Sequence, residues 1–419
     1  MIIEVLRETK FPRKAIIAAL LVLATGHGSA NGGWVIERDD RGKSPLLKER
    51  KSIAQSPEQK EQQQLARAYT NAVKQEKQKI REQWANPEVS SKSRWVAYSK
   101  DYKVKRAVDF EYNRIEVSLA GTYNGSRLDF AAMSAQVRGE VENILATSVQ
   151  QAVKQDPIQR AIDSAYASLG KDAPVQDAGN DLVLKELFAS SNPSSRAIKN
   201  KAAELVRNAS IRYQVLSASL AAVSVNPGKK LTYVVPLPDS RLRKKVLEYR
   251  PQVHKNAKRF ALSEDVVMAI MHTESHFNPL ARSHIPAFGL MQIVPSTAGR
   301  DATRKLYQKS KLLSANYLYN PSKNIEVGSA YLHVLYYQYL KDIKNPESRL
   351  YYTIAAYNAG ASNIARAFVG KASFKDAVDT INAMSPQQVL DRLVKQAPHR
   401  ETREYISKVL KRRNYYARL

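Results

Sequence analysis

Hydrophobic residues recur with two different periods along this chain of 419 residues, and the change of period separates its regions. In the stretch KRAVDFEYNRIEVSLAG, apolar and polar positions alternate on both sides of Asn113-Arg114, which predicts a β-hairpin with one buried face. SIRYQVLSASL and KKLTYVVPLP predict further strands around Pro227-Gly228, and LDFAAMSAQVRGEVENILATSVQQAV predicts a helix. We therefore expect residues 84–238 to form an α+β accessory domain with a small antiparallel sheet.

A helical period takes over after the segment PLPDSRLRKKV, in which Pro236 and Pro238 mark a natural boundary. Nearly every later segment predicts a helix with short connections, so residues 239–419 are expected to form a mainly α domain. One of these helices, NPSKNIEVGSAYLHVLYYQYL, contains Gly328. A glycine inside a helix costs stability, so we expect another segment to pack closely against it.

The N-terminal region predicts export and a connecting segment. Residues 1–30 combine a basic start, the short apolar run AIIAALLVLAT and small residues up to Ala30, which is typical of a signal peptide. An uncleaved membrane anchor is the alternative, although the run is short for a bilayer core of about 30 Å. Residues 31–83 are charged and Gln-rich with a thin apolar stripe, and they predict a helical stalk that breaks near Pro57.

Composition narrows the classes of partner. Lys and Arg number 66 against 39 Asp and Glu, and the formal net charge of +27 favours anionic partners. The export signal disfavours nucleic acid, whereas anionic stem peptides and lipids of the cell envelope remain compatible with it. The chain has no Cys, which excludes disulfides, thiolate metal sites and acylation at a cysteine. His272 and His276 lack a third ligand in the pattern, so we expect no metal and no cofactor.

A carboxylate interrupts an apolar helix face in the segment ALSEDVVMAIMHTESHF. Val267, Ile270, Met271 and Glu274 lie on one face, and the helix is expected to end before Pro279. Partial burial and the negative end of the helix dipole would both raise the pKa of Glu274. A carboxylic acid that stays protonated near neutral pH can serve as a general acid. An exposed glutamate at a frayed helix end is the alternative from spacing alone.

Four separated segments extend this pattern: ESHFNPLARS followed by AFGLMQIVPSTA, then NIEVGSAYL, AAYNAG and ETREYISKV. Together they resemble the goose-type-lysozyme-like domain of lytic transglycosylases, enzymes that cleave the glycan of the bacterial cell wall. The preceding stretch YKVKRAVDFEYNRIEVSLAG is similar to the N-terminal domain of the membrane-bound lytic murein transglycosylase C family. The resemblance implies a lysozyme-like catalytic domain over residues 239–419.

The resemblance also implies a role for individual residues. Glu274 matches the family's single catalytic acid/base. Gly289 and Met291 are expected to be architectural. The residues that match substrate contacts or their support are Ser283, Gln292, Tyr357, Asn358 and Tyr405. Three departures from the family pattern stand beside these matches: Pro286-Ala287 precedes the GLMQ segment, Val294 replaces the usual Met, and the lipoprotein cysteine is missing.

The implied reaction is cleavage of the bond between N-acetylmuramic acid and N-acetylglucosamine without water, giving 1,6-anhydromuramoyl products. Glu274 would protonate the glycosidic oxygen and then accept the proton of the muramoyl 6-hydroxyl. Glu401 and Glu404 are other carboxylates, expected to be salt-bridged at the surface. A hydrolytic lysozyme of the same fold and a non-catalytic peptidoglycan-binding module remain alternatives. The implied location is the periplasm, with possible attachment to the outer membrane.

Overall fold

The structure, a computed structural model, describes residues 34–37, 46–49, 56–120, 130–169, 178–214 and 230–419. The chain divides into two units, Met1–Lys60 and Glu61–Leu419. In the first unit, β1 (Trp34–Glu37) pairs antiparallel with β2 (Leu46–Glu49). The signal or anchor expected over residues 1–30 lies outside the described residues. Within the described part, no helix has both the length and the apolar character needed to cross a membrane.

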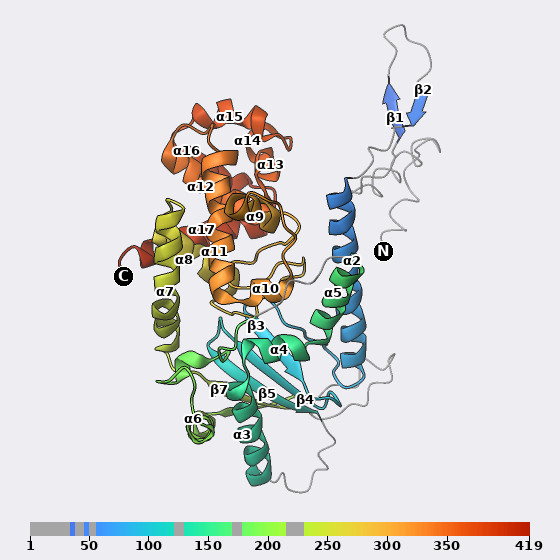
Figure 1. The fold of residues 1–419 in the computed structure, drawn as a ribbon, viewed down its shortest axis with the longest axis vertical. Coiled ribbons are helices and arrows are strands. Elements are labelled where there is room, and N and C mark those ends of the chain that lie inside the picture. The colour runs from blue at the N-terminus through green and yellow to red at the C-terminus, as the bar shows by residue number, and fades with distance from the viewer. Residues whose placement is uncertain (1–33, 38–45, 50–55, 121–129, 170–177, 215–229) are drawn as a thin grey trace, which may run out of the picture. The chain divides into compact units, whose positions relative to one another are not determined.

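A five-stranded antiparallel sheet forms the core of the accessory region, as the sequence predicts (Figure 1). Its spatial order is β3-β4-β5-β7-β6. The predicted hairpin joins β4 to β5, with Val108 opposite Ile115 and with Asn113 at a φ of 51° in the turn. Asn tolerates this left-handed conformation better than most residues do. The strands are β3 (Arg94–Tyr98), β4 (Val104–Asp109), β5 (Arg114–Ala120), β6 (Ser210–Gln214) and β7 (Lys230–Pro236).

The helix expected after the hairpin is two helices. α3 (Phe130–Ala146) ends before Ser148, and α4 (Val149–Gln155) begins after it. The Ser148 hydroxyl accepts a hydrogen bond from Gln151 N, and the Gln151 side chain accepts one from Ser148 N, which forms a capping box that starts a new helix. α3 packs on β5 and on α6 (Ser195–Arg207), while α5 (Pro157–Ser168) and the 3₁₀ turn Lys185–Leu187 complete the region.

The segment expected as a stalk contains one long helix, α2 (Pro57–Arg81), which begins at Pro57. Its thin apolar stripe is buried: Leu65, Tyr69, Ala72 and Ile80 are all covered. The Tyr69 hydroxyl donates a hydrogen bond of 2.6 Å to Ser283 O, far along the chain. This helix therefore packs along one face instead of being solvated on all sides. The domain boundaries drawn from the sequence stay predictions.

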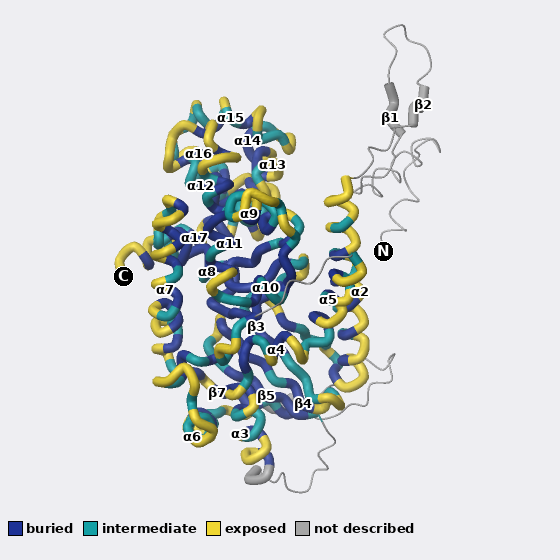
Figure 2. The backbone as a smooth tube through the Cα atoms, viewed as in Figure 1, coloured by how far each residue is buried: buried dark blue, intermediate teal, exposed yellow. Residues whose placement is uncertain are grey.

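The C-terminal region is mainly helical, so the predicted fold class is confirmed. α8 (Glu264–Ser275) packs between α7 (Arg241–Arg259) and α17 (Arg400–Tyr416), and all its residues from Val266 to Met271 are buried (Figure 2). The remaining helices are α9 (Ala298–Tyr307), α10 (Ala315–Tyr319), α11 (Pro321–His333), the π-helical η4 (Val334–Tyr339), α12 (Pro346–Ala359), α13 (Ala361–Ile364), α14 (Arg366–Val369), α15 (Phe374–Asn382) and α16 (Pro386–Gln396).

Buried ion pairs connect the accessory region to the helical region. Arg241 and Lys245 of α7 both bind Glu186, with N–O distances of 3.2 and 3.0 Å. Arg282, in the segment after α8, pairs with Asp156 at 2.6 Å. Residues 61–419 consequently form one compact unit.

Candidate active site

Glu274 lies in the last turn of α8 and is buried, with only 4% of its surface exposed. The chain turns sharply directly after it, because His276 and Phe277 both adopt left-handed φ angles of 51° and 60°. Phe277 is fully buried, and a bulky residue at positive φ is strained. Such strain is often found beside functional sites, where the surrounding structure enforces it. The exposed alternative for Glu274 is therefore wrong.

Burial raises the pKa of the Glu274 carboxyl, and two neighbours act in the opposite direction. The Lys92 ammonium, 3.6 Å from Glu274 Oε2, and the nearby Tyr405 phenol both favour the ionised form, while Glu401 favours the protonated one. The net pKa remains above the usual value for glutamate. The site therefore holds a carboxylic acid that retains its proton to higher pH than a solvated glutamate would.

Two phenols flank this carboxyl, that of buried Tyr405 and that of half-buried Tyr357. Burial raises the pKa of Tyr357 and of Tyr405 well above the usual value, and the Glu274 charge adds to both shifts. The Tyr357 hydroxyl donates a 2.8 Å hydrogen bond to Met291 O. The Tyr405 hydroxyl has no partner at full hydrogen-bonding geometry among the residues that the structure describes. Both phenols thus stay neutral, and that of Tyr405 is available as a hydrogen-bond donor.

The GLMQ segment is held in place by an irregular backbone. Gly289 has a φ of 76°, and a Cβ there would lie 2.1 Å from Leu318 O, so only glycine fits. Gln292 also has a positive φ, 48°, and its Nε2 donates to Gly289 O at 3.0 Å. Its Oε1 is buried and without a hydrogen-bond partner in the described part of the chain. A ligand with a donor group would satisfy this oxygen.

The side chain of Asn324 on α11 holds the GLMQ segment through three hydrogen bonds, and the sequence did not indicate this role. Its Oδ1 accepts from Met291 N at 2.7 Å, and its Nδ2 donates to Phe288 O and Leu318 O at 2.9 and 2.7 Å. Asn324 belongs to the NIEVGSAYL segment, which the sequence analysis did single out. The sequence alone does not show which backbone groups the side-chain amide of Asn324 binds.

The close contact expected at Gly328 is present, because a Cβ there would lie 2.3 Å from Met291 Sδ. We expect Gly328→Ala to lower the free energy of unfolding by about 1–3 kcal/mol, since the added methyl group would displace Met291. Urea denaturation measures this change. The control is Gly139→Ala in α3, where no atom lies within 4 Å. This control should stabilise the protein by roughly 0.5–1 kcal/mol, and equal effects at both positions would contradict the prediction.

The remaining predicted residues lie at the edges of the site. Ser283 is half-buried, and its hydroxyl donates to Ile285 O within the loop that contains Pro286-Ala287. It lines a cavity of about 600 Å³ together with Lys92 and Glu401. Asn358 faces α17 instead, where its Oδ1 accepts from Thr402 Oγ1 at 2.8 Å. Asn358 therefore ties α12 to α17, which agrees with a supporting role.

Glu401 and Glu404 are exposed and salt-bridged, as expected from the sequence. Glu404 pairs with Arg400 at 2.7 Å, and Glu401 pairs with Lys92 at 3.4 Å. The ion pair with Lys92 places Glu401 beside the candidate active site, which the sequence did not predict, because the same ammonium also contacts Glu274. Lys92 is a further residue of the site that the sequence did not indicate, since it precedes Glu274 by a long stretch of chain.

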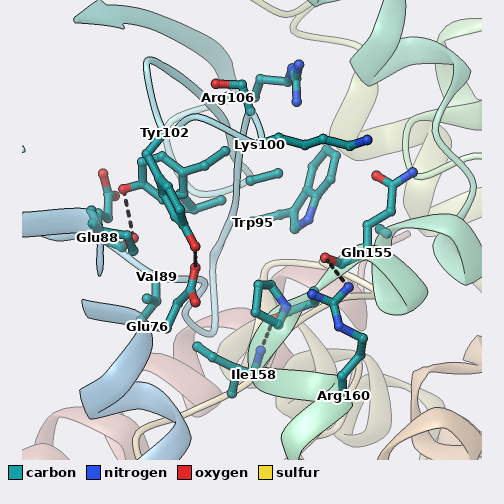
Figure 3. A pocket seen from close by; sticks show the side chains of 18 of the residues that line it. Glu76, Glu88, Val89, Trp95, Lys100, Tyr102, Arg106, Gln155, Ile158 and Arg160 are labelled. Carbon is teal, nitrogen blue, oxygen red and sulfur yellow. Dashed lines mark hydrogen bonds between the residues drawn. The ribbon is translucent and has the colours of Figure 1, made fainter. Parts of the chain in front are cut away.

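A second cavity, of about 610 Å³, lies in the accessory region and is lined by Trp95, Tyr102 and Glu76 among others (Figure 3). Its polar groups are largely paired within the protein: Tyr102 donates to Glu76 at 3.0 Å, and Arg160 donates to Gln155 O at 3.2 Å. Burial would raise the pKa of Glu88 in its lining, but Lys105 and Arg94 outweigh burial and lower that pKa.

The described residues include no group of three or more metal-ligating side chains. His272 and His276 pack edge to face, with ring centroids 5.2 Å apart. Burial lowers the pKa of His272 to about 2, and its Nδ1 shares a 2.8 Å hydrogen bond with the Tyr416 hydroxyl. These two histidines are thus packing residues beside the turn that follows Glu274.

Known proteins share this sequence pattern. Residues 251–379 match the family described as "Transglycosylase SLT domain". The chain is 32% identical over 337 residues to membrane-bound lytic murein transglycosylase C of Actinobacillus pleuropneumoniae, which covers 80% of this chain and 83% of that protein. It is 38% identical over 219 residues to the protein of that name from Klebsiella pneumoniae, covering 50% of this chain and 60% of that one.

Solved structures of similar proteins include two lytic transglycosylases. The 70-kDa soluble lytic transglycosylase of Escherichia coli is 17% identical, with a TM-score of 0.31 over 68% of this chain and 43% of that chain. An inactive mutant of the lytic transglycosylase Slt of Pseudomonas aeruginosa is 20% identical, with a TM-score of 0.32 over 70% of this chain and 47% of that chain.

Proposed function

Because this chain belongs to the lytic murein transglycosylases, enzymes that cleave peptidoglycan, we propose that Glu274 is its single catalytic acid/base. The observation that carries this proposal is the burial of the Glu274 carboxyl between two neutral phenols, with a raised pKa. The bond cleaved is the one between N-acetylmuramic acid and N-acetylglucosamine.

The first step is proton donation to the glycosidic oxygen. Glu274 enters this step protonated because burial raises its pKa, and the water-poor surroundings strengthen each charge interaction in the site. Ordinary glycosidases supply a second carboxylate as nucleophile or base. Here the substrate's own N-acetyl carbonyl stabilises the oxocarbenium-like carbon in place of that carboxylate.

The second step uses the carboxylate that the first step leaves. Glu274 removes the proton of the muramoyl 6-hydroxyl, and this oxygen closes a 1,6-anhydro ring on the same sugar. The nucleophile is held within the substrate, so the step has the advantage of an intramolecular reaction. Acid–base assistance of this kind contributes about 10²–10⁴-fold to the rate.

The neighbouring residues orient the sugar around Glu274. The Tyr405 hydroxyl beside Glu274 supplies a donor, and Gln292 Oε1, which has no partner among the described residues, supplies an acceptor. Ser283 lines the adjoining cavity and contacts the N-acetyl group, while the Tyr357 ring, fixed by its bond to Met291 O, faces the reacting ring. Asn358 holds α12 against α17 so that Tyr357 and Tyr405 keep their spacing.

The proposed location is the periplasm, where peptidoglycan lies, with association to a membrane. The basic N-terminal segment with its short apolar run supports export, and the relatives named above carry the description "membrane-bound". The formal net charge of +27 suits contact with anionic wall peptides and envelope lipids.

Product analysis tests the reaction directly. Purified sacculi digested in water enriched in heavy oxygen should release 1,6-anhydromuramoyl ends without isotope incorporation, because no water enters the product. Mass spectrometry of the released muropeptides measures both features. A parallel digest with a hydrolytic lysozyme should give labelled reducing ends. Labelled reducing ends as the main product of this protein would contradict the proposed chemistry and indicate hydrolysis.

A further inference from the structure

A lysine of the accessory region lies at the centre of the candidate active site. Lys92 precedes β3, and its Nζ is 3.6 Å from Glu274 Oε2 and 3.4 Å from Glu401 Oε1. The three side chains differ greatly in exposure: 5% for Glu274, 34% for Lys92 and 64% for Glu401. The ammonium thus bridges a buried carboxylate and a solvated one.

The loop that carries Lys92 is fixed to the segment that follows Glu274. The side-chain amide of Asn278, which is fully buried, donates to Lys92 O at 3.2 Å. Arg282 N donates to Ser91 O at 3.3 Å, which adds a second bond between the two segments. The start of the Lys92 side chain is therefore anchored by the same stretch of chain that ends the catalytic helix.

The other groups around the carboxyl are neutral or anionic. Tyr357 on α12 and Tyr405 on α17 keep their protons, since burial raises both pKa values. Glu401 on α17 opposes ionisation of Glu274. Partial burial would lower the pKa of Lys92, but Glu274 and Glu401 outweigh it and raise that pKa, so the lysine stays charged. Among the described residues, Lys92 is the cation within ion-pair distance of Glu274.

We propose that Lys92 is a positioning residue of the acid–base cycle: its ammonium stabilises the Glu274 carboxylate between the two proton transfers and pairs with Glu401 while Glu274 is protonated. This inference rests on the proposed function of Glu274. Glu274 gives its proton to the leaving glycosidic oxygen and later takes one from the muramoyl 6-hydroxyl. Lys92 keeps its own proton throughout. The accessory region thereby contributes a charge to the reaction itself.

Two variants of the full-length protein test this role of Lys92: one removes the positive charge of Lys92, and the other removes the negative charge of Glu401. Lys92→Met should lower kcat on purified sacculi by roughly tenfold, because a weaker acid donates its proton more slowly. It should also move the alkaline limb of the pH–rate profile to higher pH, since the ammonium no longer lowers the pKa of Glu274. Glu401→Gln should move the same limb to lower pH, because it removes an anion that raises this pKa. Lys92→Arg keeps the positive charge, so the alkaline limb of its pH–rate profile should stay at the wild-type pH.

The controls separate this inference from its premise. Lys244→Met removes one exposed lysine of α7 and should leave the cleavage rate and the pH–rate profile unchanged.

If Glu274→Gln abolishes cleavage while Lys92→Met leaves the alkaline limb at its wild-type pH, the role of Lys92 is refuted and the proposed function stands. If Glu274→Gln cleaves at the wild-type rate, the proposed function itself fails. A loss in Lys92→Arg as large as in Lys92→Met would show a steric role and overturn the proposal. Should Lys92→Met not fold, Lys92→Gln removes the same charge with a polar side chain, and an alkaline limb at the wild-type pH in that variant would overturn the proposal.

Discussion

Replacing Glu274 with Gln should reduce peptidoglycan cleavage by at least about 10²–10⁴-fold, because the amide can neither donate the proton to the glycosidic oxygen nor accept one afterwards. Glu and Gln have nearly the same shape, so the buried site beside Tyr357 and Tyr405 should remain intact. Release of soluble muropeptides from sacculi measures the rate. Glu264→Gln, the same exchange in the first turn of α8, should cleave like the wild type. Retention of wild-type activity by Glu274→Gln would refute the assignment.

The same variant has a signature in stability that distinguishes lost chemistry from lost structure. The folded-state pKa of Glu274 is raised above its unfolded value, so the native state binds the proton more tightly. The stability that this proton contributes is present below the unfolded pKa and is lost as pH rises through the folded pKa. Gln does not titrate and suffers no such loss. Glu274→Gln should therefore resist urea better than the wild type at alkaline pH, and a less stable variant would contradict the burial argument.

Glu274 could be found from sequence because its evidence is local. Its spacing from Val267, Ile270 and Met271 predicts a place on the buried face of α8, although spacing alone left an exposed glutamate open. The motif segments that follow it in the sequence favoured the buried acid. The hairpin at Asn113-Arg114 was predictable for the same reason, since alternation and a turn residue lie within a few positions. Features that depend on one short segment could therefore be predicted from the sequence.

Other features depend on contacts between distant segments and could not be predicted. Lys92 reaches Glu274 through a loop of another region, and no periodicity connects these two positions. The burial of α2 depends on a similar partner, because the Tyr69 hydroxyl meets Ser283 O. The break at Ser148 was missed for a different reason: a capping box competed with an otherwise continuous helical pattern.

The contacts between the two regions lead to the second large expected effect. Glu186→Gln should destabilise the folded protein by about 3–5 kcal/mol, because it removes the carboxylate that pairs with buried Arg241 and leaves buried Lys245 with Glu248 alone. Arg241 and Lys245 are each only 1% exposed, and both bind this carboxylate. Burial would lower the pKa of Lys245, but Glu186 raises it above the usual value, so the lysine is charged in the native state.

Urea denaturation followed by circular dichroism measures this loss as a lower midpoint. Glu204→Gln is the matched control: Glu204 pairs with Lys201 at 2.6 Å on an exposed face of α6, and such pairs contribute about 0–1 kcal/mol. Because Glu186 lies before α7 and its partners lie on it, the loss should be felt by the whole 61–419 unit, with the sheet and the helices unfolding in one transition. If Glu186→Gln instead unfolded at the wild-type midpoint, this ion cluster would not hold the accessory region against the helices, and the position of Lys92 over Glu274 would have to depend on Asn278 and Arg282 alone.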